Sequence, residues 1–225
     1  MEQLLTANVA TNMYWLGRYL ERAETTLYQI EKAFDKIIDV DKDAGVKLYE
    51  KFGIELEYTD AIDFLKVAIY GDHPSNIATI TRNARESAII SRIYINSSAF
   101  GEIIALDALF KRISSYALPI DYKDLDQAFS LIKEIWGENA SRGQQRSSDY
   151  FLKLGKLVEE VDNRVRFNED LEMTKLIIEE INVIFKLLSP ELDLSVDCPK
   201  ENGLKIRLDL IDKLHKSIDK LIIND

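Results

Sequence analysis

The longest helical pattern in the sequence lies near its start, where an apolar residue recurs every three or four positions. The stripe consists of Val9, Met13, Leu16, Leu20, Ala23, Leu27, Ile30, Phe34 and Ile37. Because an α-helix turns once every 3.6 residues, this spacing places all of these side chains on one face. It predicts a long helix over residues 6–38 that buries this face against neighbouring helices.

Similar spacing predicts further helices over residues 59–70, 75–96, 101–115, 123–136, 147–168, 170–189 and 203–223. Thr59 or Asp60 is expected to cap the first of these, and Asp72 or Ser75 the second. The segment 39–57 is undecided between a loop and a short helix. No segment alternates as a strand does, so we predict an all-α fold. The expected architecture is a single-domain bundle of about seven helices spanning residues 1–225.

A weak internal repeat links two of the long helices. Leu16-Gly17-Arg18-Tyr19-Leu20-Glu21 aligns with Leu154-Gly155-Lys156-Leu157-Val158-Glu159 at an offset of 138 residues. Glycine inside a helix costs about 1 kcal/mol relative to alanine, and close approach of another backbone would explain it. We predict that helices 6–38 and 147–168 pack near Gly17 and Gly155 about a local pseudo-two-fold axis. The alternative is chance similarity between two amphipathic helices.

The charge balance narrows the classes of function. The 39 acidic and 29 basic residues give a formal net charge of −10, which disfavours binding to nucleic acid or to an anionic membrane surface. No signal peptide or membrane-spanning apolar run is recognisable. Cys198 is the only cysteine, so an intramolecular disulfide is excluded. We expect a soluble, cytoplasmic protein.

Carboxylates flank the apolar stripe of the first helix. Gly17, Glu21, Glu24 and Tyr28 share one side of it, and Arg18 and Arg22 border them. Carboxylates beside a buried face can perform acid/base chemistry or bind a cation or an amine. The alternative is an ordinary polar flank with weak ion pairs.

The helix predicted over 75–96 combines small residues with charged ones, namely Arg82, Arg85, Glu86 and Arg92. Partly buried arginines need acidic partners, and the candidates are Glu21, Glu24, Glu159 and Asp162. The cluster would bind an anionic or zwitterionic ligand such as a peptide or a phosphorylated intermediate. A purely structural network of ion pairs is the alternative.

Metal and nucleotide sites find little support. The two histidines, His73 and His215, are too few for a di-iron bundle, and only Asp212 and His215 have the required spacing. No glycine-rich nucleotide loop and no nucleophile elbow is present. We therefore expect neither a cofactor nor a metal, with any ATP bound by another protein.

Three motifs in order resemble the bacterial alpha-E domain family. The first runs from Asn12 through Tyr14-Trp15-Leu16-Gly17-Arg18 to Glu24, and the second includes Asp72-His73-Pro74-Ser75 with Arg85-Glu86 and Arg92. The third is the stretch Leu154 to Asp162, which departs from the family pattern at Lys156 and Glu160.

The resemblance implies an all-α fold and a genomic context. Members of the family are encoded beside, or fused to, ATP-grasp amide ligases and transglutaminase-like peptidases, which suggests peptide synthesis or modification. The positions carried over are Tyr14, Trp15, Arg18, Arg22, Arg85 and Arg92 for binding, with Glu21, Glu24 and Glu86 as candidate acid/base residues.

Three hypotheses remain. The first is a helical accessory component that binds an ATP-grasp-type ligase or a peptide through the Arg/Glu cluster. The second is an enzyme that uses paired carboxylates on an amide or peptide substrate. The third is a structural homodimer without a ligand. Catalytic carboxylates should line a cavity with raised pKa values, whereas structural ones should be ion-paired and closed off from solvent.

Overall fold

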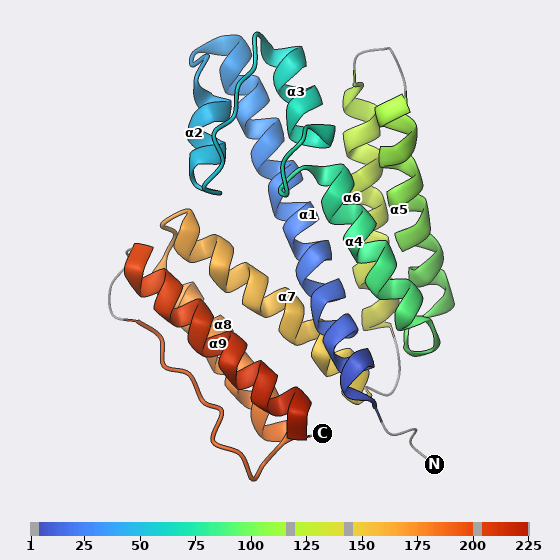
Figure 1. Cartoon of the computed structure of the whole chain (residues 1–225), viewed down its shortest axis with the longest axis vertical. Helices are drawn as coiled ribbons and strands as arrows, with labels where there is room; N and C mark the ends of the chain where they lie inside the picture. The colour runs from blue at the N-terminus through green and yellow to red at the C-terminus, as the bar shows by residue number, and fades with distance from the viewer. Residues whose placement is uncertain (1–4, 116–119, 142–145, 200–203, 225) are drawn as a thin grey trace. The chain divides into compact units, whose positions relative to one another are not determined.

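A computed structural model describes residues 5–115, 120–141, 146–199 and 204–224 (Figure 1). Within these ranges the chain forms nine α-helices and no strand, which confirms the all-α prediction. Their bounds are α1 Ala7–Asp39, α2 Ala44–Glu50, α3 Ala61–Tyr70, α4 Ile77–Ile90, α5 Ser97–Ser115, α6 Tyr122–Ala140, α7 Ser147–Arg166, α8 Leu171–Leu188 and α9 Leu204–Asn224. The expected number was about seven, and eight of the nine described helices overlap segments that the spacing marks as helical. One helix left undecided by the sequence is α2, which lies inside the segment 39–57.

The chain divides into two compact units. Unit 1 comprises residues 1–21 and 143–225, and unit 2 comprises residues 22–142. Helix α1 contributes its first part to unit 1 and the remainder to unit 2. The prediction that all residues form one domain stays a prediction.

In unit 1, α7 packs against both α8 and α9, and the first part of α1 crosses α7 (Figure 1). The core is built from aliphatic and aromatic side chains, among them Leu16, Leu20, Phe151, Leu154, Val158, Ile181, Leu214 and Ile218. The extended segment after α8 is fixed by Asn182, whose amide group donates to the Val196 carbonyl and accepts from the Val196 N–H, both at 2.9 Å. Burial of these apolar side chains is the main stabilising contribution.

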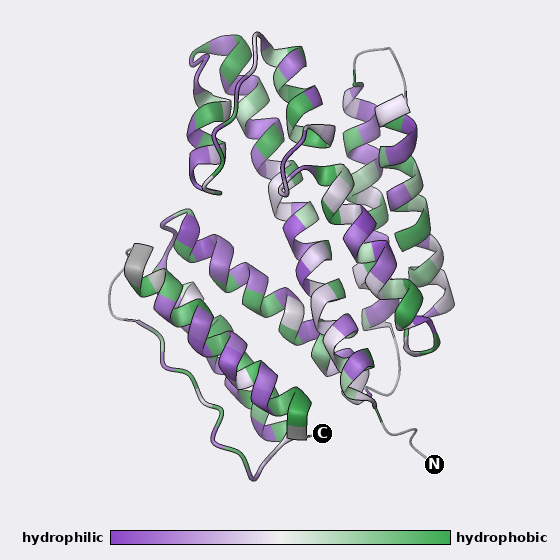
Figure 2. Ribbon diagram, viewed as in Figure 1, coloured by the Kyte–Doolittle hydropathy of each residue, from purple (hydrophilic) through white to green (hydrophobic). Residues whose placement is uncertain are grey.

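In unit 2, α5 packs between α4 and α6, and α3 contacts both α4 and α5. The stripe predicted for the first helix continues here, and every member from Ala23 to Ile37 is buried. Figure 2 shows hydrophobic and hydrophilic residues interleaved along the helices, as expected for helices that bury one face. No described helix is long and apolar enough to cross a bilayer.

The N-terminal caps of α3 and α4 can be compared with those expected from the sequence. Asp60 caps α3 as predicted, accepting a hydrogen bond from the Asp63 N–H at 2.9 Å. Helix α4 is capped by Asn76 rather than by Asp72 or Ser75. The Asn76 amide oxygen accepts from the Thr79 N–H at 2.7 Å, while its nitrogen donates to the Gly71 carbonyl at 2.8 Å. An ionised carboxylate cannot make this pair of bonds because it only accepts, whereas the amide side chain combines an NH₂ donor with a carbonyl acceptor.

Candidate functional site

The first motif is organised by a close crossing of α1 and α7 in unit 1. A Cβ atom added to Gly17 would lie 2.0 Å from the Leu152 carbonyl oxygen, and one added to Gly155 would lie 1.9 Å from the Tyr14 carbonyl oxygen. Both contacts obey the offset of 138 residues, because Leu152 corresponds to Tyr14 and Gly155 to Gly17. The predicted approach of the two helices at their glycines, related by a local pseudo-two-fold axis, is confirmed. Glycine is required at both positions because any side chain would collide with backbone.

Two ion pairs flank the crossing and follow the same symmetry. An Arg18 nitrogen lies 2.6 Å from Glu159 Oε2, with the side chains 4% and 2% exposed. At the corresponding positions, Lys156 Nζ lies 3.9 Å from Glu21 Oε2, with the side chains 35% and 11% exposed. Each pair links a cation next to a motif glycine with a glutamate of the opposite helix. One pair is thus buried and tight, and its counterpart is more exposed and longer.

Helix α9 covers the buried pair. Arg18 Nη1 lies 2.6 Å from His215 Nε2. Arginine has no acceptor, so Nε2 must accept and the proton of the neutral ring resides on Nδ1. Burial lowers the pKa of His215, and the charge of Arg18 lowers it further. The neutral imidazole therefore completes the surroundings of the guanidinium.

A cavity of about 450 Å³ opens beside this network in unit 1. Tyr14 and Trp15 of the first motif line it from α1, and His215, Ile218, Asp219 and Ile222 line it from α9. The Tyr14 side chain is buried, its hydroxyl oxygen included. Burial raises the pKa of this phenol, against an opposing effect of Arg18, so the hydroxyl keeps its proton. The cavity combines apolar walls with a few polar groups, as small-molecule and peptide pockets do.

The remaining charged residues of the first motif do not line either described cavity. Glu24 accepts a hydrogen bond from Trp136 Nε1 at 3.2 Å, within unit 2. Glu21 belongs to the ion pair with Lys156. Arg22 is half-buried. Both candidate acid/base residues of α1 are thus engaged by other side chains, which is the arrangement expected of structural carboxylates.

The charged residues of the second motif lie in unit 2 in a more exposed setting. Arg85 pairs with Glu86, its exposed neighbour, and Arg85 Nε lies 3.5 Å from the buried Asp107 of α5. Asp107 also binds Lys111 at 2.6 Å. These partners differ from the four acidic residues considered from the sequence. Arg92 is not on α4, because the helix ends at Ile90; its guanidinium lies 5.1 Å from the Phe100 ring centroid.

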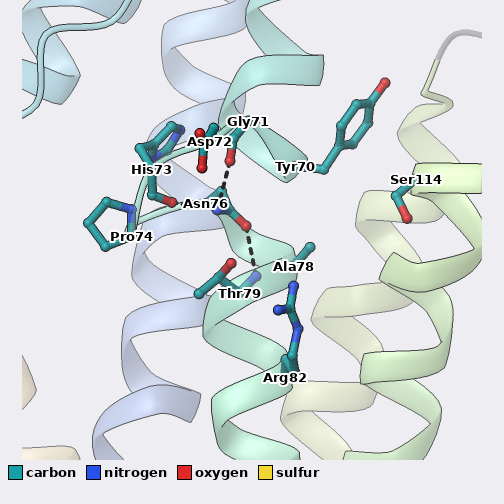
Figure 3. A pocket seen from close by; sticks show the side chains of 10 residues that line it. All are labelled: Tyr70, Gly71, Asp72, His73, Pro74, Asn76, Ala78, Thr79, Arg82 and Ser114. Carbon is teal, nitrogen blue, oxygen red and sulfur yellow. Dashed lines mark hydrogen bonds between the residues drawn. The ribbon is translucent and has the colours of Figure 1, made fainter.

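A second cavity, of about 660 Å³, lies in unit 2 where α4 begins (Figure 3). Its lining includes the loop Gly71 to Pro74, Asn76, Arg82 and Ser114. His73 Nε2 lies 3.0 Å from the Val67 carbonyl oxygen and must donate to it, which leaves a buried Nδ1 acceptor without a partner among the described residues. The exposed Asp72 and Arg82 place opposite charges on this polar cavity.

Sequence reasoning missed two of the residues that shape these sites and considered a third, His215, only as a metal ligand. The two missed residues, Asp219 and Asp107, belong to no motif, and nothing in their spacing distinguishes them from other polar residues on amphipathic helices. Within the described part of the chain, no cluster of three His, Cys, Asp or Glu side chains is suited to hold a metal ion.

The family model Alpha-E, described as a predicted alpha-helical domain with a conserved ER motif, matches residues 5–183. The match covers more than half of the 225 residues, so the chain belongs to this family. Glu21-Arg22 is the only Glu-Arg dipeptide in the sequence. No curated protein and no solved structure gives a significant match. Helix α9, which completes the cavity in unit 1, begins beyond the matched residues.

Proposed function

We propose that this alpha-E protein is an accessory binding component of a peptide-synthesising or peptide-modifying system that contains an ATP-grasp-type ligase. The proposal rests on one observation: the aromatic and the charged residues of the first motif have different roles. Its aromatic residues Tyr14 and Trp15 line the cavity in unit 1, whereas its charged residues Arg18 and Glu21 form ion pairs across the α1–α7 crossing. A motif built in this way supports a binding site better than an acid/base centre.

The carboxylates argue against chemistry by this chain alone. General acid/base catalysis requires a titratable group within hydrogen-bond reach of the substrate. Neither Glu21 nor Glu24 lines a described cavity, and Glu86 is exposed beside Arg85. Binding is therefore assigned to the cavity lined by Tyr14 and Trp15, and the ligase supplies ATP and the bond-forming step. The link to an ATP-grasp ligase rests on the family setting.

Co-purification tests the proposal. The tagged chain is expected to retain an ATP-grasp ligase encoded beside its gene, or to raise that enzyme's rate of peptide-bond formation. Trp15→Ala should weaken the effect. Tyr28→Ala is the matched control, because Tyr28 is an exposed aromatic residue of the same helix that lines neither described cavity.

Two outcomes would overturn the proposal. One is a ligase that neither binds the chain nor changes its rate in the chain's presence. The other is turnover of an amide or peptide substrate by the purified chain alone, abolished by Glu21→Gln or Glu24→Gln. That result would establish an enzyme that uses these carboxylates.

A further inference from the structure

We propose that the cavity between α1 and α9 binds the amino-terminal residue of a peptide, with a free α-ammonium group and an aliphatic side chain. The inference rests on the proposed function for the statement that a peptide is the ligand. It adds which part of the peptide is recognised and which residues recognise it.

The walls select an aliphatic side chain. Ile218 and Ile222 line the cavity from α9, one turn apart, and the Trp15 indole lines it from α1. Apolar surface of this kind favours an apolar group by about 25 cal/mol for each Å² removed from water. A volume of about 450 Å³ lies within the range of ligand pockets, at its smaller end, and suits one residue with its backbone rather than a long segment.

One hydrogen-bond donor of the lining is available for a carbonyl oxygen. It is the Nδ1–H of His215, which is fixed on that nitrogen because Nε2 accepts from Arg18. The Tyr14 hydroxyl itself is buried and under the influence of Arg18, so it does not serve as a donor to the ligand. A peptide carbonyl would accept from His215.

One carboxylate is available for the ammonium group. Asp219 lines the same cavity from α9 and is exposed. The adjacent charges of Arg18 and Glu159 compensate each other at 2.6 Å. When His215 is neutral, Asp219 is the charged residue among those that line the cavity. A positively charged ligand group is therefore favoured over an anionic one.

These preferences together define the ligand. A free amino terminus places an ammonium group, a side chain and a carbonyl group close together, which matches a carboxylate, an apolar wall and a hydrogen-bond donor around one small cavity. The α9 residues lie outside the part of the chain matched by the family model.

The probe is the tripeptide Leu-Gly-Gly, titrated into the full chain by isothermal titration calorimetry, with Trp15 fluorescence as a second readout. Leu-Gly-Gly is expected to bind. Acetylation of its amino group should weaken binding about tenfold or more, since a charge-assisted hydrogen bond is lost. Gly-Gly-Gly should also bind more weakly, because it offers no side chain to the apolar wall.

Asp219→Asn should remove most of the difference in affinity between the free and the acetylated peptide. Asp212→Asn is the matched control, because Asp212 is an exposed aspartate of the same helix that pairs with Lys216 and does not line the cavity. Asp219 is exposed, so its substitution leaves the fold intact.

The proposal is overturned if the chain binds none of the peptides at millimolar concentration. It is equally overturned if acetylation has no effect, or if Asp212→Asn matches Asp219→Asn. The two proposals fail separately. Ligase retention without peptide binding removes only the amino-terminal site, whereas peptide binding without ligase retention removes only the ligase partnership.

Discussion

The two ion pairs at the α1–α7 crossing occupy equivalent positions in a pseudo-symmetric contact, yet their environments differ. Arg18 and Glu159 are almost completely buried and have His215 of α9 against them. Lys156 and Glu21 keep contact with solvent at a separation of 3.9 Å. The difference coincides with α9, which contacts the first pair. A similar pattern of residues thus acquires a different energetic role according to what covers it.

The two ion pairs are expected to contribute differently to the free energy of unfolding. Removing one partner of a buried ion pair costs about 3–5 kcal/mol, because a charge is left uncompensated in a low-dielectric interior. An exposed pair contributes about 0–1 kcal/mol. Three measurements test whether the two pairs differ in energy as expected. Tryptophan fluorescence can follow each unit separately, because Trp15 lies in unit 1 and Trp136 in unit 2.

The largest effect is expected for Arg18→Met, which leaves Glu159 buried without its cation. We expect the free energy of unfolding of unit 1 to fall by about 3–5 kcal/mol. Urea denaturation followed through Trp15 fluorescence, in a Trp136→Phe background, measures this loss. Lys156→Met is the control at the symmetric position, with an expected loss of about 1 kcal/mol or less. Equal losses for the two variants would show that the pairs are equivalent in energy.

The crossing itself is tested by Gly17→Ala, since the new Cβ would lie 2.0 Å from the Leu152 carbonyl oxygen. The helices must separate, and a loss of about 1–3 kcal/mol is expected in the same assay, as for other overpacked contacts. Gly137→Ala in α6 has open space around its Cβ and should instead stabilise unit 2 by up to about 1 kcal/mol, measured through Trp136 in a Trp15→Phe background. An unchanged stability of Gly17→Ala would contradict the close crossing.

The smallest expected effect is on the pH dependence of the free energy of unfolding. The pKa of His215 is lowered in the folded protein, so the unfolded chain takes up a proton first as the pH falls through about 6.5. Stability contributed by the neutral ring is present above that pH and is lost below it, until the pH reaches the folded pKa. Arg18 opposes protonation, while Asp219, Asp162 and Glu159 favour it.

His215→Gln keeps an acceptor for Arg18 and removes the titration. Urea denaturation at pH 7 and pH 5 should therefore show a smaller acid-induced loss in this variant than in the unaltered chain. A residual loss is expected because burial also lowers the pKa of His73. An identical loss in the two proteins would show that His215 does not contribute to the pH dependence.

The periodicity of the sequence was sufficient to predict every described helix except α2, and the two glycines of the repeat predicted the crossing. Every residue of the apolar stripe from Met13 to Ile37 is buried, and glycines inside two amphipathic helices marked the close contact. The partners of the charged residues were not predictable. His215 reaches Arg18 from 197 residues away, and Asp107 reaches Arg85 from a different helix. Spacing along a helix reports which residues share a face, but not which distant element packs onto that face.

The reciprocal glycine contact has a consequence for assembly. In an isologous dimer, residue i of one copy contacts residue j of the other, and j contacts i in return. Gly17 with Leu152 and Gly155 with Tyr14 reproduce that relation inside a single chain. The self-complementary surface is therefore already occupied by its own counterpart. A homodimer of this protein would have to form through a different face.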